Sequence, residues 1–170
     1  MSLVFLIGGA RSGKSSLAVR LAAESGASVV FIATGEPGDA EMAERIERHR
    51  AERPAAWQTI EEPVALHGAL EGAHRESCVV VDCLSLWVAN LLEDGAGEIE
   101  EEARTAAAVA AARAAPTIAV TNEVGLGVVP ATPLGRAYRD VLGRVNAIWA
   151  DAADEAYFVV AGKALRLGDV

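Results

Sequence analysis

Residues 3–15 read Leu3-Val4-Phe5-Leu6-Ile7-Gly8-Gly9-Ala10-Arg11-Ser12-Gly13-Lys14-Ser15, five apolar residues followed by a glycine-rich loop. The last eight residues fit the pattern G-x-x-x-x-G-K-[ST], which binds nucleotide phosphates when it joins a strand to a helix. The apolar run has the length and composition of a strand, and the residues after the loop favour a helix. The stretch therefore predicts a phosphate-binding loop in the structural setting that the motif requires.

Each residue type in this loop has a chemical reason. Gly8 and Gly13 let backbone N–H groups wrap phosphate oxygens in conformations that a side chain would block. The N-terminus of the following helix points at the same anion. We expect Lys14 to reach the β- and γ-phosphates and the hydroxyl of Ser15 to complete the coordination of Mg²⁺. The alternative is a glycine-rich turn that matches by chance, and the strand and helix on either side disfavour it.

Short apolar runs alternate with helical patterns along the rest of the chain, as in a parallel sheet with helices on both faces. Strands are predicted over 3–7, 28–33, 78–82, 117–121, 156–160 and 164–167. Helices are predicted over 15–24, 39–50, 63–71, 84–93, 98–114 and 133–151, the last one capped by Thr132. Runs 79–81 and 117–120 suit central strands buried on both faces. Residues 1–170 are predicted to form a single α/β domain of the P-loop type.

Composition narrows the classes of partner. The 170 residues carry a formal net charge of −9 and no basic stripe, which argues against nucleic-acid binding. No apolar segment is long enough to span a membrane, and the opening run does not have the form of a signal peptide. Cys78 and Cys83 fit no zinc or disulfide spacing, so we expect buried free thiols in a reduced, cytoplasmic protein.

Two carboxylates follow predicted buried strands. Asp82 ends the run 78–81, where an acid would lie beside the phosphate loop and hold Mg²⁺. Glu123 follows the run 117–121 and could orient an attacking hydroxyl or assist magnesium. The alternatives are an ordinary aspartate at a strand end and a loop carboxylate beside turn glycines.

His49 lies among arginines in the predicted helix 39–50. At 3.6 residues per turn, one helix face carries Met42, Arg45, Ile46, His49 and, if the helix extends so far, Arg53. The arginines can grip a polyphosphate, and their charge favours the neutral, nucleophilic form of the imidazole. The alternative is a solvated helix with one exposed histidine. His67 and His74 lack such surroundings and are predicted to be surface residues.

These stretches together resemble one known family. The matching residues run through nearly the whole chain in order: 8–15, Ile32-Ala33-Thr34, Glu41-Met42, Arg45-Ile46, His49-Arg50, Arg53-Pro54, Trp57, Glu61, Asp82-Cys83-Leu84-Ser85, Asn90-Leu91-Leu92, 121–130 and Gly143-Arg144-Val145-Asn146. The run 121–130, Thr-Asn-Glu-Val-Gly-x-Gly-x-Val-Pro, is the most specific of them. The chain is similar to the bifunctional adenosylcobinamide kinase / adenosylcobinamide-phosphate guanylyltransferase family of cobalamin assembly.

The resemblance implies two reactions and a set of site residues. An NTP, ATP or GTP, phosphorylates the aminopropanol hydroxyl of adenosylcobinamide, and GTP then transfers GMP to that phosphate through a guanylylated histidine, which His49 matches. The family's nucleotide contacts match the phosphate loop together with Ala33, Thr34, Gly35, Arg50, Ala51, Glu52, Arg53, Glu61 and Asp82. The carboxylate of Glu61 is a candidate for reading guanine N–H groups.

The resemblance also bears on the fold and the oligomer. We expect a RecA-like P-loop fold, and the resemblance implies a homotrimer. Trp57, Trp87 and Trp149 are candidates for apolar surface buried between subunits.

Two other functions fit the motifs alone. One is a monofunctional P-loop kinase of another small hydroxylated molecule, in which His49 is incidental. The other is a non-catalytic nucleotide-sensing module whose loop only changes shape. The fate of the α- and γ-phosphates of GTP distinguishes all three.

Overall fold

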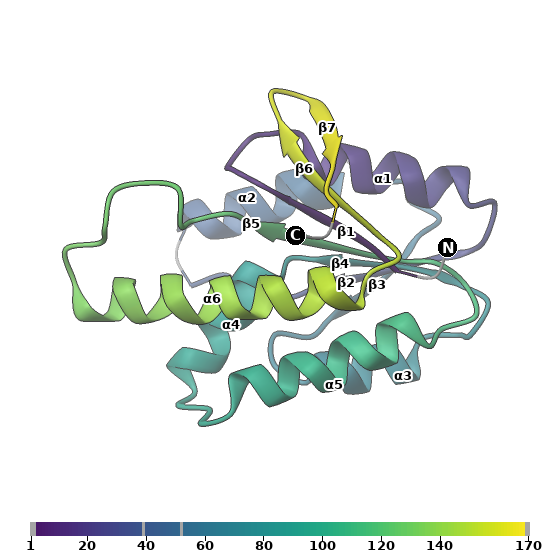
Figure 1. The fold of residues 1–170 in the computed structure, drawn as a ribbon. Helices are drawn as coiled ribbons and strands as arrows, with labels where there is room; N and C mark the ends of the chain where they lie inside the picture. Colours follow the sequence, from purple (N-terminus) through teal and green to yellow (C-terminus); the bar gives the residue numbers. More distant parts are fainter. Residues whose placement is uncertain (1–2, 39, 52, 169–170) are drawn as a thin grey trace.

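The computed structural model describes residues 3–38, 40–51 and 53–168, without the side chains of residues 41, 42, 45 and 49. Figure 1 shows the elements, which in chain order are β1 (Leu3–Gly8), α1 (Lys14–Glu24), β2 (Val29–Ala33), α2 (Ala40–Ala51), β3 (Gln58–Glu61), α3 (Leu66–Gly72), β4 (Cys78–Asp82), α4 (Leu84–Glu93), α5 (Ile99–Ala111), β5 (Thr117–Asn122), α6 (Pro133–Ala152), β6 (Glu155–Val160) and β7 (Lys163–Arg166).

The strands form one seven-stranded sheet in the order β3-β2-β4-β5-β1-β6-β7. All described neighbours pair in parallel except β6 and β7, which form an antiparallel hairpin. The central strands β4 and β5 are buried along nearly their whole length, as their apolar sequences predict. The expected α/β class with a mostly parallel sheet is confirmed.

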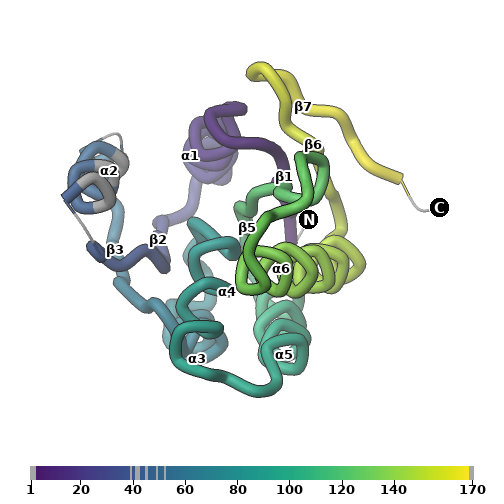
Figure 2. The backbone as a smooth tube through the Cα atoms, turned by 90° about the vertical axis from the view of Figure 1, so that its left-hand side faces the viewer, coloured from purple at the N-terminus to yellow at the C-terminus, as the bar shows by residue number. Residues whose placement is uncertain are grey.

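Successive side chains along each strand enter two different cores. Phe5 and Val81 belong to the larger core, which α3, α4, α5 and α6 cover. Leu6 and Val80 face the other side of the sheet, where Ala18 of α1 packs. Figure 2 shows α1 on one side of the sheet and α3 to α6 on the other. The expected arrangement of helices on both faces is therefore confirmed.

Trp87 and Trp149 lie inside the larger core and are 1% and 0% exposed. The expectation that these two tryptophans supply apolar surface between subunits was wrong, because the amphipathic helices α4 and α6 turn them toward the sheet. Trp57 is partly buried and packs against the smaller core.

The predicted elements are confirmed with ends shifted by at most three residues. Thr132 caps α6 as expected, and its Oγ1 accepts a hydrogen bond from the Gly135 N–H at 3.1 Å. Strand β3 was not predicted. It is a four-residue edge strand, Gln-Thr-Ile-Glu, with one partly buried side chain, and therefore lacks the apolar run of a central strand.

Cys78 and Cys83 are buried free thiols, as predicted. In the part of the chain that the structure describes, no helix combines the length and apolar character needed to cross a membrane.

Candidate functional site

The phosphate loop connects β1 to α1 at the carboxyl end of the sheet. Gly13 has a φ of 102°, which favours glycine, and non-glycine Arg11 also adopts a left-handed φ of 55°. Gly8 is required for a different reason: a Cβ at this position would lie 2.1 Å from the carbonyl oxygen of Val159. The close packing of β1 against β6 therefore excludes any side chain at Gly8.

Lys14 opens α1 and is only 7% exposed. Its Nζ donates to the carbonyl of Gly9 at 2.6 Å and to the hydroxyl of Ser12 at 3.3 Å. These bonds fold the ammonium group back over the loop. The positive end of the α1 dipole points into the same space, which favours an anion there.

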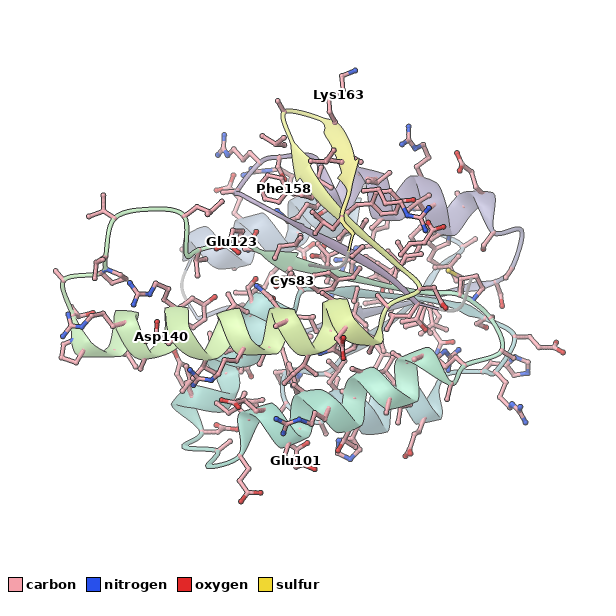
Figure 3. All side chains as sticks on the ribbon, viewed as in Figure 1. Cys83, Glu101, Glu123, Asp140, Phe158 and Lys163 are labelled. Carbon is pink, nitrogen blue, oxygen red and sulfur yellow. The ribbon has the colours of Figure 1, made fainter. Side chains whose placement is uncertain are left out.

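The β6–β7 hairpin supports the loop from one side. The N–H of Gly162 donates to the carbonyl of Ser12 at 2.8 Å. Figure 3 shows Lys163, at the start of β7, projecting away from the body of the molecule. Of the two lysines in the sequence, Lys14 lies in the loop and Lys163 does not.

Ser15 and Asp82 come together from different elements. The Ser15 hydroxyl donates to the Asp82 carboxylate at 3.4 Å, across the space between α1 and the end of β4. One hydroxyl and one carboxylate suit Mg²⁺, which commonly takes one or two protein oxygens and completes its shell with phosphates and water. No cluster of three or more histidines, cysteines or acids able to hold a metal occurs among the residues described. The donor set thus fits a metal that arrives with a nucleotide.

A cavity of about 460 Å³ opens at this end of the sheet. Its described lining comprises Ala10, Arg11, Ser12, Gly13, Lys14, Ser15, Ser16, Ala33, Gly35, Glu44, Ile46, Arg48, Arg50, Arg53, Thr59, Glu61, Asp82, Cys83, Leu86, Val120 and Asn122. Five of these side chains are basic and three are acidic, so the lining is locally positive in a chain of net charge −9. This charge suits a polyphosphate.

Helix α2 and strand β3 form the wall opposite the phosphate loop. Arg50 of α2 pairs with Glu61 of β3 and, at 2.9 Å, with Glu47. The Arg53 guanidinium lies 3.6 Å from the centre of the Phe31 ring. Burial lowers the pKa of Arg53, the neighbouring Asp82 raises it, and the group stays charged. Arg48 and Arg50 of this wall and Arg53, from the segment between α2 and β3, thus line the cavity.

The structure places most of the predicted contacts around the cavity. Described lining residues include 10–15, Ala33, Gly35, Arg50, Arg53, Glu61 and Asp82. Gly8, Gly9, Thr34, Ala51 and Glu123 do not line it. Glu52 and the side chains of Arg45 and His49 lie outside the described residues, although the backbone of His49 is part of α2. The helix ends at Ala51, two residues before Arg53.

Thr34 and Glu123 have local partners instead. The buried Thr34 hydroxyl donates to the Cys83 carbonyl at 2.7 Å and accepts from the Cys83 N–H at 2.9 Å, which joins the ends of β2 and β4. The Glu123 carboxylate accepts a hydrogen bond from the N–H of Gly125 within its own turn. Figure 3 shows Glu123 at the start of the long loop that leads to α6.

His67 is partly exposed and His74 is exposed, in agreement with the prediction of surface residues. Burial raises the pKa of the Cys83 thiol to about 11, so this lining residue remains protonated at neutral pH.

Sequence reasoning missed Arg48, Thr59 and Asn122, which all line the cavity. Thr59 was missed because its strand, β3, was not predicted. Asn122 lies in the run 121–130 that carries the resemblance, but only Glu123 was given a role there. Strand periodicity offers a signal, since Val120 and Asn122 share one face and both line the cavity.

One known protein family matches nearly the whole chain. The sequence profile described as "Cobinamide kinase / cobinamide phosphate guanyltransferase" matches residues 4–167. The chain belongs to this family. The members of this family are bifunctional enzymes. In this chain, the α/β P-loop fold described above carries the site.

Similar relatives cover almost the whole chain. The bifunctional adenosylcobalamin biosynthesis protein CobP of Pseudomonas aeruginosa is 46% identical over 95% of this chain and 95% of its own length. The corresponding CobU protein of Escherichia coli strain K12 is 37% identical over 97% of this chain and 99% of its own length. Among solved structures, the flagellar accessory protein FlaH of Methanocaldococcus jannaschii has a TM-score of 0.54 at 16% identity, covering 98% of this chain and 77% of its own. This last likeness concerns the fold alone.

Proposed function

We propose that residues 1–170 form one domain that phosphorylates adenosylcobinamide with an NTP and then transfers GMP from GTP to the resulting phosphate. Membership of the family supports the pair of reactions. The observation that carries the proposal is one cavity with the phosphate loop and Asp82 on one side and α2, the helix of His49, on the other. A triphosphate bound in this cavity can face both the acceptor hydroxyl and His49.

In the first reaction, the acceptor hydroxyl oxygen bonds to the γ-phosphorus of the NTP and releases its proton to solvent. The bond from that phosphorus to the β–γ bridging oxygen breaks, and the electron pair leaves with the diphosphate. Lys14 and the loop N–H groups hold the phosphates while charge develops.

In the second reaction, an imidazole nitrogen of His49 attacks the α-phosphorus of GTP, and the bond to the α–β bridging oxygen breaks to release pyrophosphate. An oxygen of adenosylcobinamide phosphate then attacks the same phosphorus and breaks the P–N bond, which gives adenosylcobinamide-GDP and restores the histidine. A neutral nucleophile avoids the repulsion that one phosphate anion meets when it attacks another. Arg50 and Arg53 line the cavity wall that this helix helps to form and reduce the negative charge around the reacting phosphorus.

Ser15 and Asp82 are the residues that would hold Mg²⁺. When bound, the ion offsets phosphate charge and stabilises a departing diphosphate or pyrophosphate. Glu61 is our candidate for guanine selection, since its carboxylate can accept base N–H bonds once it exchanges its pairing with Arg50. We assign no catalytic role to Glu123.

Labelled GTP tests this function. We expect α-label to become attached to the protein and then to adenosylcobinamide phosphate, and γ-label to pass to adenosylcobinamide. Transfer of γ-label alone, to any small molecule, would indicate a monofunctional kinase. Binding without transfer of either label would indicate a nucleotide sensor.

We further propose that the enzyme is a homotrimer of the cytoplasm, in line with the family resemblance and its free thiols. Light scattering at micromolar concentration should give three times the chain mass. A monomer would remove the trimer from the proposal and leave the two reactions unaffected.

A further inference from the structure

Asn122 is the polar side chain at the end of β5 that faces the cavity. β5 lies between β1, which leads into the phosphate loop, and β4, which ends at Asp82. The register makes Asn122 the direct neighbour of Gly8, the first residue of the loop, and Val120 the neighbour of Asp82. The sheet thus places Asn122 on the strand between the phosphate loop and Asp82, beside the first residue of the loop and two residues beyond the level of Asp82.

A hydrogen-bonded network holds Asn122 in this position. Its Nδ2 donates to the hydroxyl of Ser85 at 2.9 Å, and Ser85 is 2% exposed. The backbone carbonyl of Asn122 accepts a bond from the side chain of Asn146 of α6 at 3.2 Å, and the hydroxyl of Tyr138 donates to the backbone carbonyl of Ser85 at 3.0 Å. The Ser85 hydroxyl therefore restricts the side-chain amide of Asn122, while α6 holds the backbone of both residues in place.

The amide has a second N–H besides the one that it donates to Ser85. Lys14 reaches the β- and γ-phosphates in loops of this kind, and Ser15 and Asp82 would hold a Mg²⁺ ion that arrives with the nucleotide. The terminal phosphate of a bound triphosphate would lie near these groups. A neutral donor at this point can bond a γ-phosphate oxygen without adding charge or accepting a proton.

Resting on the proposed function, we propose that Asn122 donates a hydrogen bond to the γ-phosphate and serves the kinase reaction selectively. In that reaction, the acceptor oxygen bonds to the γ-phosphorus, the β–γ bridge breaks, and the hydroxyl proton leaves to solvent. The contact with the reacting phosphoryl group strengthens as charge develops on its oxygens. In guanylyl transfer the γ-phosphate only departs within pyrophosphate, so the same contact contributes to binding and little to the chemical step.

Nucleotide affinity provides a test that needs no acceptor. We would measure the dissociation constants of GDP and of GTP with an imido β–γ bridge, in the presence of Mg²⁺. Asn122→Ala should weaken binding of the GTP analogue about tenfold and leave GDP within about twofold, because only the γ-phosphate meets the amide. Glu123 is the next residue in the chain and does not line the cavity. Glu123→Gln should therefore change neither dissociation constant. An equal loss for both nucleotides, or none for either, would overturn the proposal.

Kinetics provide the second test. Asn122→Ala should lower kcat of the kinase reaction about a hundredfold and leave kcat of guanylyl transfer within about twofold. Asn122→Asp, which keeps the size but places a negative charge beside the phosphate, should be at least as defective as a kinase. Equal losses in both reactions would contradict selectivity. If the wild-type protein transferred neither group, the proposed function would fail, while the ratio of the two affinities would still decide the role of Asn122.

Discussion

The two walls of the cavity are built in different ways. The wall formed by the phosphate loop and the end of β4, which we call the phosphate wall, belongs to the sheet. In it, Lys14 is buried, Gly8 packs against the backbone of β6, and Asp82 ends a strand of the core. The opposite wall, which we call the α2 wall, consists of α2 and the edge strand β3. Its ion pairs Arg50–Glu61 and Arg48–Glu44 are exposed. Figure 2 shows α2 at the periphery, beside β3 and away from the other helices.

This difference separates two tasks. A triphosphate needs donors that are already in place, because reorganising them would cost free energy during the reaction. Surface ion pairs contribute little stability and exchange partners easily. The phosphate wall is therefore suited to hold the polyphosphate in both reactions, and the α2 wall to exchange its own pairs for contacts with a nucleotide.

The largest effect is expected at Lys14. Lys14→Ala should reduce both phosphoryl and guanylyl transfer about a thousandfold or more, because both reactions need the same charge-assisted grip on the triphosphate. Lys163→Ala is the matched control, since this exposed lysine lies on the hairpin outside the cavity. Near-normal guanylyl transfer by Lys14→Ala would show that the two reactions do not share one phosphate wall.

A pair of glycines tests how rigid that wall is. Gly8→Ala should lower the free energy of unfolding by about 3 kcal/mol or more, since the new methyl group meets a backbone carbonyl that cannot move freely. Gly9→Ala has no atom within 4 Å of the new Cβ and should change that free energy by less than about 1 kcal/mol. Urea unfolding of both variants would measure the contrast, and equal stabilities would show that the loop is not fixed by β6.

Asp82→Asn should retain the fold and require at least about tenfold more Mg²⁺ for half-maximal activity, because a neutral amide holds the ion weakly. Asp151→Asn, on an exposed position of α6, is the control. An unchanged magnesium titration would leave Asp82 only the role of a strand end.

A substitution in the α2 wall should change nucleotide binding and leave the free energy of unfolding nearly unchanged. Arg50→Ala should raise KM for GTP about tenfold, reduce its salt dependence, and change the free energy of unfolding by no more than about 0.5 kcal/mol. Arg104→Ala removes a comparable exposed ion pair, with Glu101 in α5, and should leave KM unchanged. A large loss of stability on replacing Arg50 would contradict the division between the two walls.

The same division explains what the sequence could predict. The phosphate wall could be foreseen residue by residue, because its glycines, lysine and serine are confined to one local motif and Asp82 closes an apolar run. Strand order could not be foreseen: the placement of β5 between β1 and β4 depends on long-range packing. Asn122, which gains its position from that order, was consequently overlooked.

The α2 wall was only partly predictable. Helical spacing indicated a basic face, yet the helix ends before Arg53, and Arg53 reaches the cavity from the segment that follows. β3 escaped prediction because an edge strand needs few apolar residues, and Thr59 was lost with it. Helix and loop surfaces are specified by partners from elsewhere in the chain, which local patterns do not record.

The central claim is that His49 carries GMP during the reaction, and intact-mass measurement after incubation with GTP and Mg²⁺ tests it most directly. The wild-type protein should gain the mass of one guanylyl group, in a linkage labile to acid and stable to alkali, as expected of a phosphoramidate. His49→Ala should gain none while it still binds GTP. An acid-labile adduct of the same mass on the His49→Ala protein would assign the nucleophile to another residue, such as His67 or His74, and would contradict the account.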